Sequence, residues 1–306
     1  MNIFISTSSF GKYDDLPLRM LKDCGYDVQL NPHGRKLTTD ECLTLYKNID
    51  GLIAGTEMLD ASVLKSAENL KIISRCGVGI DNVDSKAARE LGIKLYSTPD
   101  GPTLAVAELT VGLILTLLRQ VPQMDRDIRD GTWKKRMGNL LQGQHVGVIG
   151  FGRIGRKTAE ILTNFGTELA YCDPMVLEAE AGYLKMGLME LLSWANIITI
   201  HVSGQQMLIG HNELQQMNKG AWLVSCARGG VVDETALYQA LKERKISGAA
   251  IDCFGEEPYY GPLKELDNVI LTPHIGSYAI EARVNMEVQS VNNLITGFSD
   301  IRFKNH

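Results

Sequence analysis

Short apolar runs alternate with helical patterns along the first third of the chain. Runs rich in isoleucine, leucine and valine predict strands, and the amphipathic stretches between them predict helices. The predicted strands cover residues 2–6, 27–30, 51–55, 71–77 and 93–98, and the predicted helices cover 17–25, 39–48, 60–69 and 84–92. Because strand and helix alternate at roughly 20-residue spacing, we expect right-handed βαβ units and a parallel sheet covered by helices on both faces.

The same alternation resumes in the second half of the chain. The predicted strands there cover 146–149, 167–173, 197–202, 222–227, 248–254 and 268–272, and the helices cover 156–166, 188–196, 211–218 and 233–245. One long helix over 103–119 precedes this half, and turn formers at 98–102 place the domain crossing just before it. A final helix over 277–297 has no strand after it, so we expect it to pack back onto one of two doubly wound domains.

A glycine-rich turn at 150–155 follows the first strand of the second half. Gly150 permits a tight turn, Gly152 lets the backbone approach a pyrophosphate, and Gly155 lets the helix pack close to the strand. The phosphates would then lie at a helix N-terminus. The spacing alone also fits a glycine turn without a ligand.

Asp173 ends the next predicted strand, about 20 residues beyond the glycine turn. A carboxylate at this place can accept hydrogen bonds from both ribose hydroxyls of NAD. Pro174 and Met175 follow it and supply no cation for the 2′-phosphate of NADP. The turn and Asp173 together predict that the chain binds NAD in preference to NADP.

Three polar side chains follow later strands, where a parallel sheet places its reactive groups. Arg228, Glu257 and His274 come after the strands that begin at 222, 248 and 268. Hydride transfer to a 2-oxo acid needs a cation for the carboxylate and carbonyl, which suits arginine. It also needs a proton donor, and a histidine is favoured in its charged form by a neighbouring carboxylate. The three residues therefore form a candidate catalytic set.

Each of these residues also has a structural interpretation. Arg228 could cap a sheet, Glu257 beside Glu256 could be a solvated charge pair, and His274 could be an interface histidine. His201, at the end of another strand, is a weaker candidate for the cofactor groove. In the first half, Gly77 and Gly79 form either a plain strand-to-helix turn or a set of backbone N–H groups that hold a substrate carboxylate.

Composition narrows the partners of such a protein. The apolar share of 44% and the charged share of 22% are typical of a globular protein. The net charge is -5 and the charges are mixed in sign, so the chain has no basic stripe. Nucleic acid or an anionic membrane surface is therefore not an expected partner. Six scattered cysteines without a CxxC pair predict reduced thiols, a cytoplasmic location, no zinc cage and no metal site. The apolar run 104–118 contains Glu108 and is too short for a membrane span, so it predicts a buried helix.

Four ordered motifs resemble one known family. They are GFGRIG at 150–155, CARGGVVDETAL at 226–237, AIDCFGEEP at 250–258 and LTPHIGS at 271–277, and they are similar to those of the NAD-dependent D-2-hydroxyacid dehydrogenases. The resemblance extends to 74–84 and 105–120 in the first half. It implies an enzyme that interconverts a D-2-hydroxy acid and its 2-oxo acid, with 3-phosphoglycerate as the leading substrate and hydroxypyruvate, glyoxylate or D-lactate as alternatives.

The resemblance also implies roles for particular residues. Arg228 corresponds to the substrate arginine, Glu257 to the glutamate that pairs with the histidine, and His274 to the acid/base histidine. The implied cofactor residues are Gly150, Gly152, Arg153, Ile154, Gly155, Asp173, Cys226, Ala227, Asp252 and Gly276. Among them, Asp252 would bind the carboxamide of the nicotinamide. The implied substrate residues are Arg75, Val78 and Gly79 together with Arg228.

The layout of the family implies a discontinuous substrate-binding domain. A flavodoxin-like domain would comprise 1–99 and 278–306, and a Rossmann-like NAD domain would comprise 100–277. The active site would lie in a cleft between the two domains. Hinges near Pro99 and Ser277 would close this cleft. A homodimer through the NAD domain and a short form without a C-terminal regulatory domain are also implied.

One departure from the family concerns the substrate. Phosphoglycerate-binding relatives often carry an arginine after the third strand, where this chain has Thr56 and Glu57. Arg75 could supply a cation instead, although it fits a structural ion pair equally well. The alternative from another functional class is an NADH-sensing, corepressor-like binding protein. Such a protein could lose its catalytic residues, whereas Arg228, Glu257 and His274 are all present in this chain, which favours the enzyme.

Overall fold

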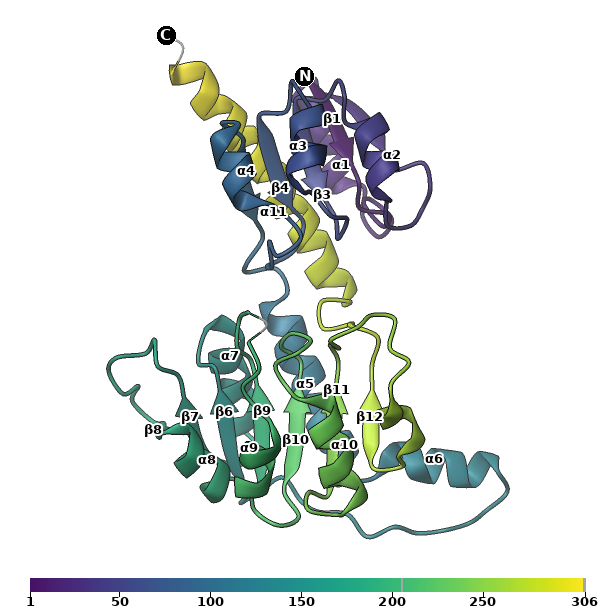
Figure 1. Ribbon diagram of the computed structural model, residues 1–306, viewed down its shortest axis with the longest axis vertical. Helices are drawn as coiled ribbons and strands as arrows, with labels where there is room; N and C mark the ends of the chain where they lie inside the picture. Colours follow the sequence, from purple (N-terminus) through teal and green to yellow (C-terminus); the bar gives the residue numbers. More distant parts are fainter. Residues whose placement is uncertain (205, 305–306) are drawn as a thin grey trace. The chain divides into compact units, whose positions relative to one another are not determined.

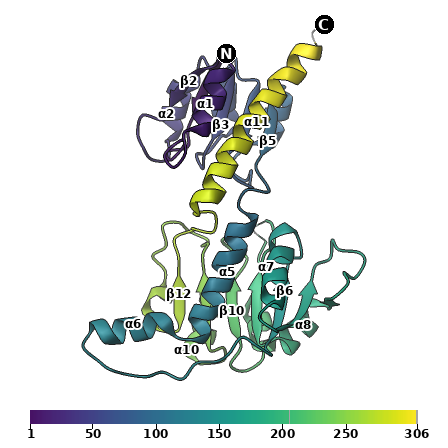
Figure 2. The same cartoon turned by 180° about the vertical axis from the view of Figure 1, so that it is seen from behind.

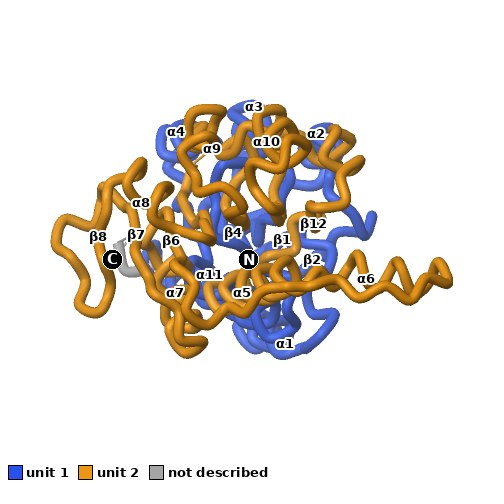
Figure 3. The backbone as a smooth tube through the Cα atoms, turned by 90° about the horizontal axis from the view of Figure 1, so that it is seen from below, with its two compact units in different colours: residues 1–102, 277–306 blue, residues 103–276 orange. Residues whose placement is uncertain are grey.

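The computed structural model describes residues 1–204 and 206–304, and the chain forms two compact units (Figure 3). Unit 1 comprises Met1–Pro102 and Ser277–His306, and unit 2 comprises Thr103–Gly276. Each unit has its own parallel sheet, which confirms the predicted α/β class with two parallel sheets.

The sheet of unit 1 has five strands in the order β2-β1-β3-β4-β5 (Figure 1). They are β1 (Asn2–Ile5), β2 (Asp27–Leu30), β3 (Gly51–Ala54), β4 (Ile72–Arg75) and β5 (Lys94–Ser97). All neighbours pair in parallel, so the loops that follow the strands meet at one edge of the sheet. This is the flavodoxin-like strand order, in which ligands bind beyond the carboxyl ends of the strands.

Helices cover both faces of this sheet. One face packs against α1 (Leu16–Asp23) and α11 (Ile280–Lys304), and the other against α2 (Thr39–Leu45), α3 (Ala61–Ser66) and α4 (Ser85–Glu90) (Figures 1 and 2). Leu294 and Phe298 of α11 are buried in one core with Ile53 and Ile72. The final helix therefore packs back onto the first sheet, as an apolar stripe without a following strand predicts.

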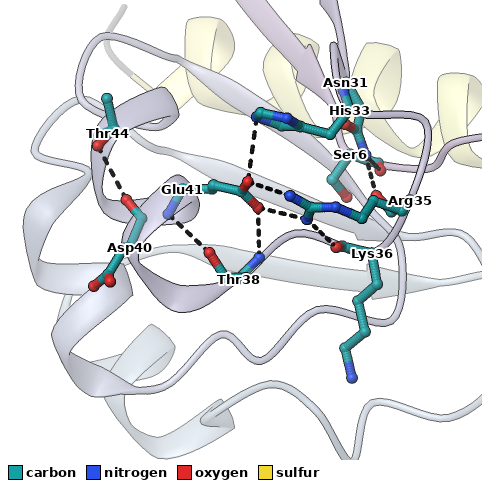
Figure 4. A network of polar contacts seen from close by, with 9 residues as sticks. All are labelled: Ser6, Asn31, His33, Arg35, Lys36, Thr38, Asp40, Glu41 and Thr44. Atoms are coloured by element: carbon teal, nitrogen blue, oxygen red, sulfur yellow. Dashed lines mark hydrogen bonds and ion pairs between the residues drawn. The ribbon is translucent and has the colours of Figure 1, made fainter.

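A polar network orders the connection between β2 and α2 (Figure 4). The Arg35 guanidinium donates hydrogen bonds to both carboxylate oxygens of Glu41 at 2.7 and 2.9 Å, and the Thr38 backbone N–H donates to Oε2 of the same carboxylate at 2.8 Å. Arg35, and then Thr38, lower the pKa of Glu41 to about 2. Asn31 joins this loop to the end of β1 by donating to the carbonyl oxygen of Ser6 at 2.7 Å.

The sheet of unit 2 has seven parallel strands in the order β12-β11-β10-β9-β6-β7-β8 (Figure 1). They are β6 (His145–Ile149), β7 (Glu168–Cys172), β8 (Leu184–Lys185), β9 (Ile197–Ile200), β10 (Trp222–Ser225), β11 (Gly248–Ile251) and β12 (Val269–Leu271). The direction of winding reverses between β6 and β9. In doubly wound sheets, ligands bind beyond the carboxyl ends of the strands at such a switch point.

The helices of unit 2 cover both faces of its sheet. They are α5 (Thr103–Leu118), α7 (Arg153–Thr163), α8 (Leu188–Trp194), α9 (His211–Gln216) and α10 (Glu234–Lys242), with α6 (Val121–Arg129) and a short 3₁₀ helix, η1 (Pro262–Glu265), at the periphery. Figures 1 and 2 show α5 and α7 on one face and α8, α9 and α10 on the other. The buried residues of α5 share a core with those of β6 and α7.

Two details of unit 2 differ from the sequence expectation. The predicted helix 103–119 ends at Leu118, and after Gln120, whose φ is 51°, a separate helix α6 begins with Pro122 in its first turn. A proline cannot donate a backbone hydrogen bond, so it ends one helix and suits the start of the next. The short strand β8 was not predicted because its two residues are exposed and carry no apolar pattern.

Among the described residues, no single helix passes the length and hydropathy test for a membrane span, and only α5 and α6 pass it together, as a pair bent by 62°.

Candidate active site

The glycine turn lies at the switch point between β6 and β9. Gly150 has a φ of 87°, and a Cβ there would approach the carbonyl carbon of His201 to 2.8 Å. A Cβ on Gly155 would clash with the carbonyl oxygen of Gly150, so the helix can approach the turn only without a side chain. A Cβ on Gly152, the N-cap of α7, would meet nothing within 4 Å. The backbone beside Gly152 is therefore open to a ligand, and Arg153 and Ile154 begin the helix behind it.

Asp173 connects the end of β7 to this turn. Its Oδ2 accepts a hydrogen bond from the backbone N–H of Phe151 at 2.7 Å, and its Oδ1 accepts one from Met175 at 2.8 Å. Each oxygen of a carboxylate has a second lone pair, so both can also accept from a ligand hydroxyl. The ring of Phe151 stacks on Tyr171 with a centroid distance of 4.0 Å, which fixes the turn against β7.

His201 follows β9 beside the turn. Its Nε2 lies 2.9 Å from the Thr199 hydroxyl, and its buried Nδ1 has no hydrogen-bond partner among the described residues. Burial lowers the pKa of His201 to about 3, so the imidazole is neutral near pH 7. A neutral, half-buried ring with an enclosed Nδ1 supports the wall of the site and is a poor proton donor.

The strand β10 leads into the predicted arginine. Cys226 and Ala227 are 7% and 3% exposed, and burial raises the pKa of the Cys226 thiol to about 12. Arg228 is partly buried, and its guanidinium donates to the carbonyl oxygen of Ala227 at 2.9 Å. A Cβ on Gly229 would clash with the carbonyl oxygen of Phe254, so the loop after β10 packs directly against the loop after β11.

Asp252 holds the loop that carries the predicted histidine. Its carboxylate, 1% exposed, accepts hydrogen bonds from the Thr272 hydroxyl at 2.5 Å and from the backbone N–H groups of Ile275 and Gly276, both at 2.9 Å. Its backbone carbonyl oxygen accepts from the N–H of His274 at 2.8 Å. The structure thus gives Asp252 and Gly276 a clear role in shaping the 272–276 loop.

His274 and Glu257 form a pair at this edge of the sheet. The Nδ1 atom of His274 lies 3.1 Å from both carboxylate oxygens of Glu257, and Oε1 also accepts from the backbone N–H of Phe254 at 3.1 Å. The side chains of His274 and Glu257 are 50% and 41% exposed. A carboxylate at Nδ1 fixes the tautomer and orientation of the ring and leaves Nε2 available for proton transfer.

Unit 1 carries a second set of predicted residues. Arg75 ends β4, and its guanidinium folds against Gly77 and donates to the carbonyl oxygen of Cys76. The backbone N–H of Gly77 donates to the Thr98 hydroxyl at 2.8 Å. Val78 is exposed and Gly79 is partly exposed, so this turn presents its backbone at the carboxyl edge of the sheet.

Glu57 occupies the loop after β3 at the same edge of unit 1. It is 1% exposed, and its Oε1 accepts hydrogen bonds from the Ser6 hydroxyl at 2.5 Å and the Tyr46 hydroxyl at 3.2 Å. The backbone N–H of Gly55 donates to the Ser6 hydroxyl at 2.7 Å. Glu57 therefore braces the loops after β1 and β3 from inside, and Thr56 is the exposed side chain of the pair.

Two residues that matter for the site were not singled out in the sequence. Thr272 holds the Asp252 carboxylate, and Cys253, 6% exposed, lies beside Glu257 and His274. Both stand within the motifs that carry the family resemblance, but neither has a chemical signal of its own at the sequence level.

Comparisons with known proteins identify the family of the chain. Residues 111–276 match the family model for the D-isomer specific 2-hydroxyacid dehydrogenase NAD binding domain. D-3-phosphoglycerate dehydrogenase from Methanocaldococcus jannaschii is 42% identical over 81% of this chain and 49% of its own length. Glyoxylate reductase from Thermofilum pendens is 39% identical over 91% of this chain and 87% of its own. The chain spans about half the length of most of the curated relatives it matches, 49% and 45% for the first two.

Solved structures of similar fold cover nearly the whole chain. The TT0316 protein from Thermus thermophilus superimposes with a TM-score of 0.91 at 33% identity, covering 98% of this chain and 97% of its own. D-2-hydroxyisocaproate dehydrogenase has a TM-score of 0.87 at 25% identity, covering 98% and 97%. The family model, the relatives and the fold agree, and the chain belongs to the D-isomer specific 2-hydroxyacid dehydrogenase family.

Proposed function

We propose that the protein is an NAD-dependent oxidoreductase that interconverts a D-2-hydroxy acid and its 2-oxo acid. The observation that carries this proposal is the 3.1 Å contact between His274 Nδ1 and the Glu257 carboxylate, at the same sheet edge as the glycine turn. Family membership supports the same reaction, and the residues around Gly152 and Asp173 fit an NAD molecule. Bound NAD supplies a hydride acceptor or donor at its nicotinamide ring.

The residues of unit 2 divide into binding and proton-transfer roles. Gly150, Gly152, Arg153, Ile154 and Gly155 bind the pyrophosphate, and Asp173 accepts hydrogen bonds from the ribose hydroxyls. Cys226, Ala227 and the loop held by Asp252 and Gly276 shape the nicotinamide end of the site. Asp252 already accepts three hydrogen bonds from its own loop, so we assign it a positioning role there.

Proton transfer falls to His274. In the reducing direction, Nε2 donates a proton to the carbonyl oxygen of the 2-oxo acid while Glu257 stabilises the ring through Nδ1. In the oxidising direction, Nε2 accepts the hydroxyl proton. Arg228 binds the substrate carboxylate and polarises the carbonyl group, since a guanidinium can form two parallel hydrogen bonds with a planar anion.

The substrate proposal rests on the relatives and on unit 1. We propose 3-phosphoglycerate as the leading substrate, because relatives about 40% identical bear the name D-3-phosphoglycerate dehydrogenase. Arg75, Val78 and Gly79 would contact the substrate. The buried Glu57 favours a second candidate, a small unphosphorylated acid such as hydroxypyruvate or glyoxylate, since the loop after β3 presents Thr56 where a phosphate would need a cation. The Arg35 guanidinium of the neighbouring loop is already paired with Glu41.

The domain roles and assembly extend the proposal. Residues 1–99 and 278–306 would bind substrate, residues 100–277 would bind NAD, and two chains would form a homodimer in the cytoplasm through the NAD domain. Exposed apolar side chains after α6 support such an interface: Trp133 is 82% exposed, Met137 92% and Leu140 70%. Apolar side chains clustered on one exposed segment are typical of interaction sites.

Initial rates of NADH oxidation on four 2-oxo acids test the proposal. The acids are 3-phosphohydroxypyruvate, hydroxypyruvate, glyoxylate and pyruvate, each also assayed with NADPH. We expect 3-phosphohydroxypyruvate to give the highest kcat/KM and NADH to exceed NADPH. A tenfold preference for hydroxypyruvate or glyoxylate would establish the second candidate. NADH binding without oxidation on any acid would refute the enzymatic proposal and favour a nucleotide-sensing binding protein.

A further inference from the structure

Cys253 lies against the His274–Glu257 pair and has no part in the proposed reaction. It follows Asp252 at the end of β11, is 6% exposed, and points its sulfur toward the pair. One ligand atom each from Cys253, Glu257 and His274 lie within 4.8 Å of one another. Glu257 and His274 are partly exposed, so solvent and dissolved ions can reach the group from their side.

The chemistry of the three atoms suits a zinc ion. Thiolate, imidazole and carboxylate are the three ligand types that Zn²⁺ binds in proteins, and sites with three protein ligands keep a fourth position for water. Zinc bond lengths of about 2.0–2.3 Å in a tetrahedron put neighbouring ligand atoms roughly 3.3–3.6 Å apart. The His274 Nδ1 and Glu257 oxygens, at 3.1 Å, are already near that separation. The sulfur lies within 4.8 Å of the chosen His274 and Glu257 ligand atoms and would complete the set by approaching them.

The neighbouring groups determine which residues can participate. Asp252 is committed to its loop through three hydrogen bonds, so it is not a fourth ligand. The fourth position falls to water. Binding releases the thiol proton of Cys253 to solvent, and the proton on Nδ1 of the neutral His274 ring moves to Nε2 through solvent, so that Nδ1 can bind the metal ion.

We propose that Cys253, Glu257 and His274 form a Zn²⁺ site whose occupation inhibits the enzyme reversibly. The inhibition rests on the proposed function, because a metal ion at Nδ1 of His274 prevents the ring from becoming doubly protonated and takes the Glu257 carboxylate away from it. Nε2 then keeps its proton and can neither donate as a charged ring nor accept the hydroxyl proton. The metal binding itself does not rest on the proposed function. The site is an inhibitory one, separate from any requirement of the reaction.

Binding is tested by cobalt substitution, which needs no turnover. Purified protein comprising residues 1–306, kept reduced, is titrated with Co²⁺. Binding is followed by sulfur-to-cobalt charge-transfer absorption in the near ultraviolet. We expect one Co²⁺ per chain, displaced by Zn²⁺, and loss of the band in Cys253→Ala. The exposed Cys24 provides a matched control, and Cys24→Ala should keep the band.

Two further measurements complete the test. Cys253→Val serves as a second variant if Cys253→Ala unfolds, and circular dichroism confirms folding. With a 2-oxo acid that the enzyme reduces, the Zn²⁺ concentration for half-inhibition should rise at least tenfold in the Cys253 variant, and a chelator should restore wild-type activity. A wild-type protein without the band, or a band that survives in folded Cys253 variants, would overturn the site. A band in the wild type without inhibition by Zn²⁺ would overturn its effect on turnover.

Discussion

Glu257 and His274 are joined twice, because both carboxylate oxygens of Glu257 lie 3.1 Å from Nδ1 of His274. One of these oxygens also accepts from the backbone N–H of Phe254 at 3.1 Å, so the carboxylate is held by the loop after β11 while it orients a ring on the loop after β12. The pair thus links the ends of two neighbouring strands of unit 2. A substitution can remove the charge of the carboxylate and keep its hydrogen-bond acceptor.

Glu257→Gln is expected to lower kcat by about 10²-fold with little change in NADH affinity. The glutamine oxygen can still accept from Phe254, but the negative charge that stabilises a protonated ring is lost. Steady-state kinetics and NADH fluorescence titration measure the two effects. Glu256→Gln, at the adjacent exposed position, is the matched control and should behave like wild type. Unchanged kcat in Glu257→Gln would show that the pair is structural only.

Asp173→Ala is expected to reduce the preference for NADH over NADPH at least tenfold, about 1.4 kcal/mol. The substitution removes the acceptor for the ribose hydroxyls and the charge that repels a 2′-phosphate. The ratio of kcat/KM values for the two cofactors measures this preference. Met175→Ala, which leaves the carboxylate in place, should retain the wild-type ratio. If Asp173→Ala kept the full preference, another residue would have to recognise the ribose.

His201 should make the protein less stable in acid. Burial lowers its folded-state pKa to about 3 from an ordinary value of 6.5, so the unfolded chain binds the proton more readily. Its contribution to stability is therefore fully present above pH 6.5 and is lost as pH falls toward 3, at about 1.4 kcal/mol per pH unit.

Urea unfolding of wild type and His201→Gln between pH 7.5 and 4.5 isolates this contribution. The glutamine amide can still reach Thr199 but does not titrate in this range. The stability difference between the two proteins should shrink steadily below pH 6.5. A difference that stays constant with pH would mean that His201 is not held neutral by burial.

The proposed homodimer predicts that Trp133→Ser combined with Met137→Ser raises the dimer dissociation constant at least tenfold. These two side chains are 82% and 92% exposed in the single chain, and burial of apolar surface drives association. Sedimentation velocity over a range of concentrations measures the change. Leu177→Ser, which alters an 87% exposed side chain elsewhere in unit 2, is the control. A double variant that associates like wild type would exclude this segment as the interface.

The alternation of strands and helices was sufficient to predict the two parallel sheets. Each long element carries its own apolar period, so the pattern located nearly all of them. It did not locate β8, which has two exposed residues, or the break at Gln120, where a left-handed residue and a following proline start a new helix. Such features depend on local backbone geometry and leave little apolar signal.

The sequence predicts those residues of the candidate site that come directly after a predicted strand. The contact between His274 and Glu257 connects adjacent strands, and the placement of each residue after its strand anticipates it. The inward orientation of Glu57 was not predictable, because its partners Ser6 and Tyr46 come from other parts of the chain. Cys253 was missed for the same reason: its neighbour His274 comes from a different strand end, so no short ligand spacing appears in the sequence.

Hydride transfer is the central claim, and deuterium transfer tests it most directly. Wild type and His274→Ala are incubated with NADH deuterated at C4 of the nicotinamide, on each face in turn, and with the best 2-oxo acid. The account predicts that one face delivers deuterium to C2 of a D-2-hydroxy acid. It also predicts that His274→Ala slows this transfer by about 10²–10⁴-fold while NADH affinity is kept. Oxidised NADH without deuterium at C2, an L-configured product, or undiminished transfer in His274→Ala would contradict it.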